Sequence, residues 1–98
     1  GDTVLHVACR AGSYQFIKKL LEKKTININL QNKKGDTPLH EAAFRDDAAM
    51  VELLLLNKAD HTIKNKEDLT PYDLTTDTDI ELKLLVLHST FVKETPKT

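Results

Sequence analysis

Residues 35–43 read GDTPLHEAA, and residues 1–9 read GDTVLHVAC. The two stretches share Gly, Asp, Thr, Leu, His and one Ala at matching places, and they begin 34 residues apart. A third stretch, DLTPYDLTT, follows at residues 68–76, another 33 residues along the chain. A phrase that recurs at such a period indicates a tandem repeat of one small structural unit.

A leucine-rich stretch recurs in step with this phrase. Residues 16–21 (FIKKLL), 50–55 (MVELLL) and 80–85 (IELKLL) take matching places in the three copies. Their apolar residues follow the spacing of one side of an α-helix. We therefore divide the chain into unit one (residues 1–34), unit two (35–67), unit three (68–91) and a tail or linker (92–98).

Unit two has clear signals for two short helices. Thr37 is a suitable N-cap, and the following proline suits the first position of a helix, so the first helix is predicted from Pro38 to Arg45. Asp46-Asp47 interrupts the pattern and can cap a second helix from Ala48 to Asn57. So short a helix pair cannot bury its apolar face alone, whereas stacked copies can, which is the principle of a solenoid.

The motif resembles the ankyrin repeat. The run Gly-x-Thr-Pro-Leu-His-x-Ala-Ala is followed by Val-x-Leu-Leu-Leu and then Ala-Asp, and the resemblance covers about residues 1 to 88. It implies an all-α solenoid of stacked helix-turn-helix units, joined by β-turn or hairpin-like loops. Units one and two would be ankyrin repeats, and residues 68–91 a degenerate C-terminal capping repeat.

Departures from the motif predict local differences. Asp46 stands where the pattern has Gly, which predicts a strained or rearranged turn between the helices of unit two. Thr75 and Thr76 replace the Ala pair in unit three. Polar residues on a face that otherwise stacks predict a capping unit. Unit one has no such polar face, so we expect further repeats before it in a longer parent protein.

Composition excludes several broad classes. The chain has 98 residues, 40% of them hydrophobic, and a formal net charge of −1, which does not indicate nucleic-acid binding. No apolar run is long enough to span a membrane. Cys9 is the sole cysteine, so an internal disulfide is impossible, and a reducing compartment, the cytoplasm or the nucleus, is expected. We expect this fragment to be a monomer.

No catalytic or metal-binding pattern is complete in the sequence. His6 and Cys9 have possible ligand spacing on one helix, but two ligands do not make a site. His40-Glu41 begins like a metalloprotease helix, yet Phe44 takes the place of the second histidine. We expect no enzyme activity and no cofactor. The resemblance implies that His6 and His40 bond locally and tie Thr to the loop of the next unit. Cys9 is predicted to be a packed inert thiol, and His61 and His88 are predicted to lie on the surface.

The resemblance further implies a groove formed by the inter-unit turns and the first helices, which binds partner proteins. The aromatic ring of Phe44 beside Arg45 has the composition of a binding hot spot. The alternative is that Phe44 only packs over Arg10 or Leu74. The predicted partner-binding residues are Arg10, Lys33, Lys34, Asp36, Glu41, Phe44, Arg45, Lys66, Glu67, Leu69 and Asp77.

Charge is distributed unevenly along the chain. Residues 1–34 hold seven basic and two acidic side chains, whereas residues 35–68 hold four basic and eight acidic ones. Acids on the groove side predict a partner protein or peptide of basic or mixed charge. The sequence thus predicts a protein-interaction module that binds another protein or its own parent chain. The alternative is an architectural spacer that only sets the distance between other domains.

Overall fold

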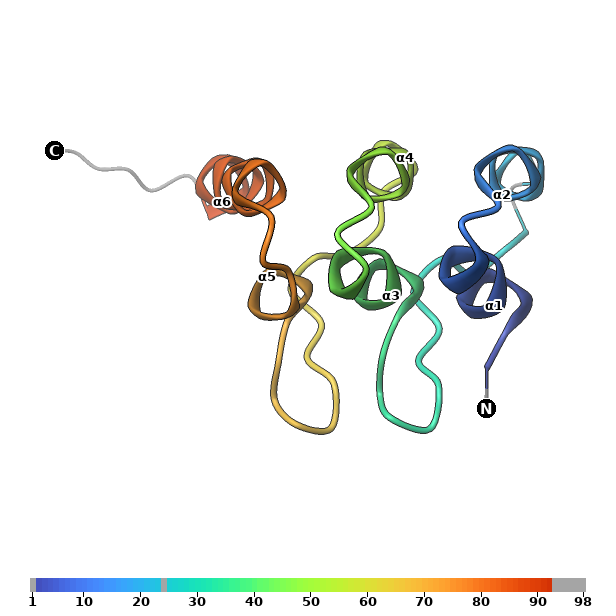
Figure 1. Ribbon diagram of the computed structural model, residues 1–98, viewed down its shortest axis with the longest axis horizontal. Helices are drawn as coiled ribbons and strands as arrows, with labels where there is room; N and C mark the ends of the chain where they lie inside the picture. Colours follow the sequence, from blue (N-terminus) through green and yellow to red (C-terminus); the bar gives the residue numbers. More distant parts are fainter. Residues whose placement is uncertain (1, 24, 93–98) are drawn as a thin grey trace, which may run out of the picture.

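The computed structural model describes residues 2–23 and 25–92, with side chains described as far as residue 86. Its described residues form helices and no strands. The first helices of the units are α1 (Val4–Ala11), α3 (Pro38–Phe44) and α5 (Pro71–Leu74), and the second helices are α2 (Tyr14–Leu21), α4 (Ala48–Leu56) and α6 (Thr78–Val92). Figure 1 shows them as two parallel rows, with the loops between units projecting from the row of first helices. The predicted all-α solenoid is confirmed.

Each unit begins with a threonine cap. Thr3, Thr37 and Thr70 precede the first helices in extended conformation. Thr3 and Thr37 form a reciprocal capping box with the histidine three places on, whereas the N–H and hydroxyl of Thr70 both donate to Asp73 Oδ2 at 2.9 and 3.0 Å. In unit two, His40 N–H donates to Thr37 Oγ1 at 3.3 Å, and Thr37 N–H donates to His40 Nδ1 at 3.0 Å. These bonds satisfy backbone groups that a helix start leaves without partners, which explains why the Thr-x-x-His phrase recurs.

The helix pair of unit two follows the prediction within one residue at each end. Helix α3 stops at Phe44 instead of Arg45, and α4 stops at Leu56 instead of Asn57. Asp47 caps α4 by accepting from Met50 N–H at 3.2 Å. Asp46 has a φ of 55°, in the left-handed region, at the place that Gly12 occupies in unit one with a φ of 73°. The predicted strain of this turn is confirmed, because a residue with a Cβ atom is unfavourable there.

The core is aliphatic and continuous through the units. Its largest fully buried apolar side chains are Leu5, Ile17, Leu39, Met50, Leu54, Ile80 and Leu84. Helix α4 contacts both α2 and α6, which is why its sequence is apolar on nearly every side. Small residues line the inner row, where Ala42 and Ala43 are fully buried and let α3 pack closely against its neighbours. Stability therefore arises from contacts between adjacent units.

The two threonines of unit three correct one prediction. They do not form a polar outer face, because both turn back toward unit two. Thr75 Oγ1 donates to Asp46 Oδ1 at 2.6 Å, and Thr76 Oγ1 donates to Asp46 Oδ2 at 2.7 Å. Helix α5 ends at Leu74, so these residues lie in the turn before α6 and not on a helix face. Their hydroxyl groups therefore hold unit three to unit two through Asp46.

The outward side of α6 carries exposed apolar residues. Ile80 and Leu84, one turn apart, are buried toward α4. Leu82 and Val86 lie on the opposite side of the helix, 53% and 63% exposed, and Leu85 between them is 46% exposed. The capping role of residues 68–91 therefore stays a prediction, and the described part of α6 does not supply a polar final face.

Candidate protein-binding groove

Two asparagines build the loops that form one wall of the candidate groove. Asn32 Oδ1 accepts the N–H groups of Lys34 and Asp36 at 2.9 and 3.0 Å, and Asn65 Oδ1 does the same one unit later. A side-chain oxygen that bonds nearby N–H groups fixes a tight turn. Sequence analysis did not select these asparagines, although their 33-residue separation could have identified them.

The two loops are bonded to each other. Lys66 N–H donates to Lys34 O at 2.9 Å, and Asn65 Nδ2 donates to Asp36 Oδ1 at 2.9 Å. Gly35 permits this approach, because a Cβ atom there would lie 2.7 Å from Lys66 N, and its φ is 81°. The loops consequently form a wall with a fixed spacing.

The buried histidines fasten each first helix to the following loop. His6 Nε2 lies 2.6 Å from Asp36 O, and His40 Nε2 lies 2.9 Å from Leu69 O. Nδ1 of His40 accepts from Thr37 N–H, so the ring proton is on Nε2, which donates to the Leu69 carbonyl. Burial lowers the pKa of His40, in keeping with this neutral form. The predicted local role is confirmed, and both ring nitrogens are occupied.

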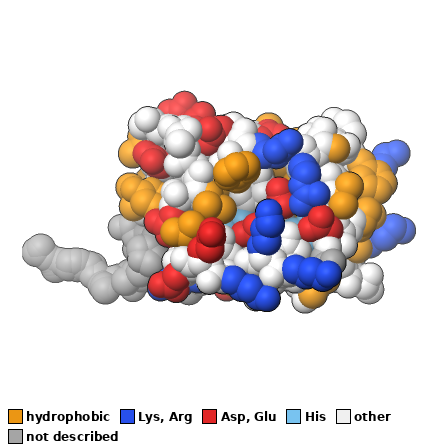
Figure 2. All heavy atoms as spheres, turned by 60° about the horizontal axis from the view of Figure 1, so that its bottom comes forward, with side chains coloured by type: hydrophobic (Ala, Val, Ile, Leu, Met, Phe, Trp, Pro, Cys, Tyr) orange, Lys and Arg blue, Asp and Glu red, His pale blue; other side chains and the backbone are white. Residues whose placement is uncertain are grey.

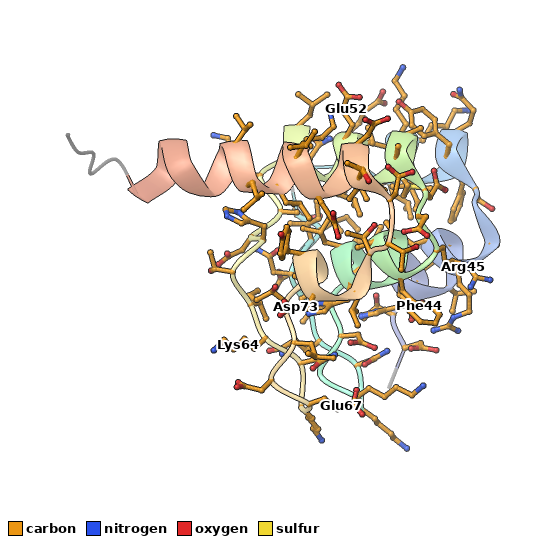
Figure 3. The ribbon with its side chains drawn as sticks, turned by 60° about the vertical axis from the view of Figure 1, so that its left-hand side comes forward. Phe44, Arg45, Glu52, Lys64, Glu67 and Asp73 are labelled. Carbon is orange, nitrogen blue, oxygen red and sulfur yellow. The ribbon has the colours of Figure 1, made fainter. Side chains whose placement is uncertain are left out.

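A cleft of about 530 Å³ lies between the loops and the first helices. It brings together eight of the residues predicted to bind a partner: Arg10, Lys33, Lys34, Asp36, Glu41, Phe44, Arg45 and Glu67. Asp2, Asn32, Asn65 and Leu74 complete its lining. In Figure 3, Phe44 and Arg45 project together from the end of α3, whereas Lys64 points to the other side of the loops and Glu52 lies on the far row of helices.

Three predicted residues lie outside this lining, each with a structural contact of its own. The exposed Lys66 bonds the neighbouring loop through its backbone. Leu69 is half-buried and offers its carbonyl to His40. Asp77 caps α6, where its Oδ1 accepts from the backbone N–H groups of Asp79 and Ile80 at 2.8 and 3.2 Å. The cleft is therefore shorter toward unit three than the sequence suggested.

An ion-pair cluster crosses the floor of the cleft. Arg10 Nη1 lies 3.0 Å from Asp2 Oδ2, and its Nη2 lies 2.6 Å from Glu41 Oε2. Asn32 Nδ2 also donates to Asp2 Oδ1 at 2.9 Å. The Arg10 and Asn32 bonds lower the pKa of Asp2 to about 2, and the Glu41 and Asp2 carboxylates raise the pKa of Arg10. The cluster thus stays charged at neutral pH and joins α1 to α3.

Phe44 remains available to a ligand. Its side chain is 63% exposed although it shares the cleft with Arg10 and Leu74. Arg45, the next residue, is held by one bond from its Nε to Arg10 O at 2.8 Å. An exposed ring beside a fixed guanidinium at the edge of a concave surface is a typical anchor for a protein partner.

The charge of the cleft is mixed and not acidic as expected. Its lining holds four acidic side chains, Asp2, Asp36, Glu41 and Glu67, and four basic ones, Arg10, Lys33, Lys34 and Arg45. Figure 2 shows acidic and basic side chains interspersed across the face that carries the loops. The counts along the sequence missed this balance, because the loop of unit one contributes its lysines to the surface of unit two.

The remaining residues considered for chemistry have structural surroundings. Cys9 is fully buried, and this burial raises its pKa to about 12, so the prediction of a packed, inert thiol is confirmed. His61 is half-buried instead of exposed, and the side chain of His88 lies outside those described.

Among the described residues, no three His, Cys, Asp or Glu side chains are grouped as metal ligands. No helix in the described ranges has the length and apolarity to cross a membrane.

Comparison with known proteins agrees with the geometry of the units. Residues 1–65 match the family model described as ankyrin repeats (3 copies). The chain belongs to the ankyrin repeat family. Ankyrin repeats are protein-interaction modules. The ankyrin repeat domain of Bcl-3 superposes with a TM-score of 0.82 at 27% sequence identity, over 87% of this chain and 37% of that domain. The Osh1 ANK domain from Kluyveromyces lactis gives a TM-score of 0.80 at 25% identity, over 90% of this chain and 38% of that one.

The region similar to this chain is a small part of each curated relative. The chain is 40% identical over 74 residues to alpha-latrocrustotoxin-Lt1a of Latrodectus tredecimguttatus, covering 76% of this chain and 5% of the toxin. It is 40% identical over 80 residues to ankyrin repeat and SOCS box protein 11 of Danio rerio, covering 81% of this chain and 26% of that protein. The chain thus spans about a quarter of the latter relative's length, and far less of the toxin's.

Proposed function

We propose that this ankyrin array recognises a segment of another protein, or of its own parent chain, through the cleft between its loops and first helices. It would do so in the cytoplasm or the nucleus. The observation that supports this most strongly is the position of Phe44, which is 63% exposed and lines the cleft of about 530 Å³. An aromatic anchor in a concavity rimmed by polar groups is the composition of interaction hot spots.

The rigidity of the walls supports the same function. The loops are bonded to each other through Lys66 and Lys34, and to the helices through His6 and His40. A surface already held in its binding shape loses little conformational freedom when a ligand binds. The cleft would therefore act as a preformed groove for an extended segment.

The experiment compares two exposed apolar residues on different rows of helices. Phe44 lines the cleft, and Leu56, 75% exposed, ends α4 in the outer row. Tagged wild type, Phe44→Ala and Leu56→Ala are expressed in cells and their bound proteins are quantified. Groove recognition predicts partners that are lost with Phe44→Ala and kept with Leu56→Ala. Partners that survive Phe44→Ala unchanged would contradict the proposal, provided that circular dichroism shows both variants folded.

The inter-unit bonds also suit the second candidate, an architectural spacer, because they fix the distance between the ends of the array. A spacer requires its length and stiffness but no particular groove residue. It predicts that neither Phe44→Ala nor Leu56→Ala changes any association of the parent protein. The same pair of variants therefore distinguishes the two functions.

A further inference from the structure

We infer that the cleft selects an acidic segment that carries an apolar side chain beside its carboxylates. This inference rests on the proposed function and names the chemistry of the partner. It reverses the expectation of a basic partner from charge counts. The reason is that the acids of the cleft already have partners within the chain, whereas most of its bases do not.

Three of the four carboxylates in the cleft are already bonded. Asp2 accepts from Arg10 at 3.0 Å and from Asn32 at 2.9 Å. Glu41 accepts from Arg10 at 2.6 Å, and Asp36 accepts from Asn65 Nδ2 at 2.9 Å. A basic ligand would have to compete with these bonds. Each of these carboxylates therefore has fewer free acceptor sites for a basic ligand, while the bond from the neutral Asn65 amide leaves the charge of Asp36 in place.

Three of the four bases keep their charge available. Arg10 is shared between Asp2 and Glu41, but Lys33 and Lys34 form no ion pair with any residue that the structure describes. Arg45 uses only Nε, toward the carbonyl of Arg10, so its two terminal nitrogens have no acceptor within the described ranges. A planar guanidinium with free terminal nitrogens suits a carboxylate. Among the lining residues that form no ion pair within the described ranges, the three cations thus outnumber the two anions, Asp36 and Glu67.

An apolar contact lies directly beside this positive charge. The exposed ring of Phe44 adjoins Arg45 in sequence, and the half-buried Leu74 lines the same cleft from α5. A ligand side chain such as Leu or Phe could cover the ring while a neighbouring carboxylate meets the guanidinium. Lys33 and Lys34, on the loop wall, would meet a second acidic residue.

Glu67 is the exception, since it is exposed and forms no ion pair among the described residues. It lies at the loop of unit two, where Figure 3 shows it below and apart from Phe44 and Arg45. Glu67 follows Lys66, whose N–H bonds Lys34 O, so its carboxylate lies on the same loop wall as the two lysines and offsets part of their charge. Like charges repel, so the main acidic side chain of the segment would meet Arg45, away from Glu67, with Lys33 as a second contact.

The test selects ligands without prejudging their charge. Random peptides of about twelve residues, each able to extend about 3.3 Å per residue, are displayed on phage and selected against the 98-residue chain. Peptides that also bind the Phe44→Ala variant are removed. The net charge and apolar content of the enriched peptides are then compared with those of the starting library.

Each outcome has a distinct meaning. Enriched peptides that combine Asp or Glu with a neighbouring aliphatic or aromatic residue support the inference. Enrichment of basic peptides would overturn it while leaving groove recognition intact. No enrichment of any peptide that depends on Phe44 would contradict the proposed function itself, and the inference with it.

A charge exchange adds a quantitative check on an enriched acidic peptide. Lys33→Glu should weaken its binding about tenfold at low salt, because an attraction becomes a repulsion. Lys64, which pairs with Asp68 at 3.6 Å, lies outside the cleft lining, so Lys64→Glu serves as the control and should change affinity little. The same peptide with its acids replaced by Lys should bind Lys33→Glu more tightly than it binds wild type. Equal effects of Lys33→Glu and Lys64→Glu would overturn the inference.

Discussion

Asp46 of unit two and Thr75 of unit three form a hydrogen bond of 2.6 Å between the Thr75 hydroxyl and Asp46 Oδ1. The same carboxylate accepts from the backbone and the hydroxyl of Thr76 at 3.0 and 2.7 Å. Asp46 holds a left-handed backbone conformation with a φ of 55°. The hydrogen bonds that Asp46 forms to unit three therefore compensate for the strain in its own turn. This explains why aspartate can replace glycine at this position.

Substitutions of Asp46 should separate its two roles. Asp46→Gly removes the strain and the bonds together, Asp46→Asn keeps an acceptor and tolerates the left-handed region, and Asp46→Ala keeps the strain without the bonds. We expect thermal stability to fall in the order wild type, Asn, Gly, Ala, as measured by circular dichroism. A Gly variant more stable than wild type would show that the bonds to Thr75 and Thr76 contribute less than the strain takes away.

Gly35 should be far less tolerant of alanine than Gly12. Both have positive φ, but a Cβ on Gly12 would meet no atom within 4 Å, whereas one on Gly35 would lie 2.7 Å from Lys66 N. We expect Gly12→Ala to lower the free energy of unfolding by about 1–2 kcal/mol. Gly35→Ala should lower it by about 3 kcal/mol or more, since it also separates the two loops. Urea denaturation measures both, and equal losses would refute the close loop contact.

Two leucines of α6 test which side of this helix is buried. Leu84 is 1% exposed and Leu82 is 53% exposed. Leu84→Ala should lower the free energy of unfolding by about 2–5 kcal/mol, because it leaves a cavity against α4. Leu82→Ala should change it by no more than about 0.5 kcal/mol. A large loss with Leu82→Ala in urea denaturation would indicate that a neighbouring unit or copy covers that face.

His40 should make stability depend on pH. Burial lowers its pKa in the folded state below the ordinary 6.5, so the unfolded chain binds the proton more readily. The contribution of the neutral ring is fully present above pH 6.5 and is lost as the pH falls through that value toward the folded-state pKa. Thermal melting of wild type should therefore fall between pH 7.5 and 5 more steeply than that of His40→Gln.

The comparison with His40→Gln isolates this residue, because the other histidines are present in both proteins. Asp2, Asp46 and Asp60 have lowered pKa values, so their effects belong to pH values below about 3.8, outside this window. Parallel pH curves for wild type and His40→Gln would show that His40 binds protons equally well in folded and unfolded chains.

Local patterns predicted the fold well because each unit repeats the same helix-capping residues and the same apolar spacing. The Thr-Pro-Leu-His phrase predicted a cap and a helix start, and its resemblance to the ankyrin motif assigned His40 its bond to the next loop, at Leu69. The replacement of Gly by Asp46 likewise predicted a strained turn. The cap, the helix start and the turn depend on neighbours three to five residues away, which a sequence displays directly.

The site was predicted less completely, because it depends on contacts between units. The number of acids in unit two did not reveal that Arg10 of unit one neutralises Glu41, or that Asn65 bonds Asp36. Thr75 appeared to be an outward polar residue, and only its bond across the joint to Asp46 shows otherwise. Asn32 and Asn65 were overlooked because asparagine is common in loops. Only their separation by one repeat length, 33 residues, indicated that both have the same role.

Photo-crosslinking from two positions tests groove recognition most directly. Benzoylphenylalanine replaces Phe44 in one protein and Leu56 in another, both sites being well exposed but on different rows of helices. After irradiation in cells, recognition through the cleft predicts a discrete crosslinked partner from position 44 that is absent from position 56. The crosslinked segment should be acidic with an adjacent apolar residue. The same partner captured from position 56 but not from position 44 would contradict binding in the cleft.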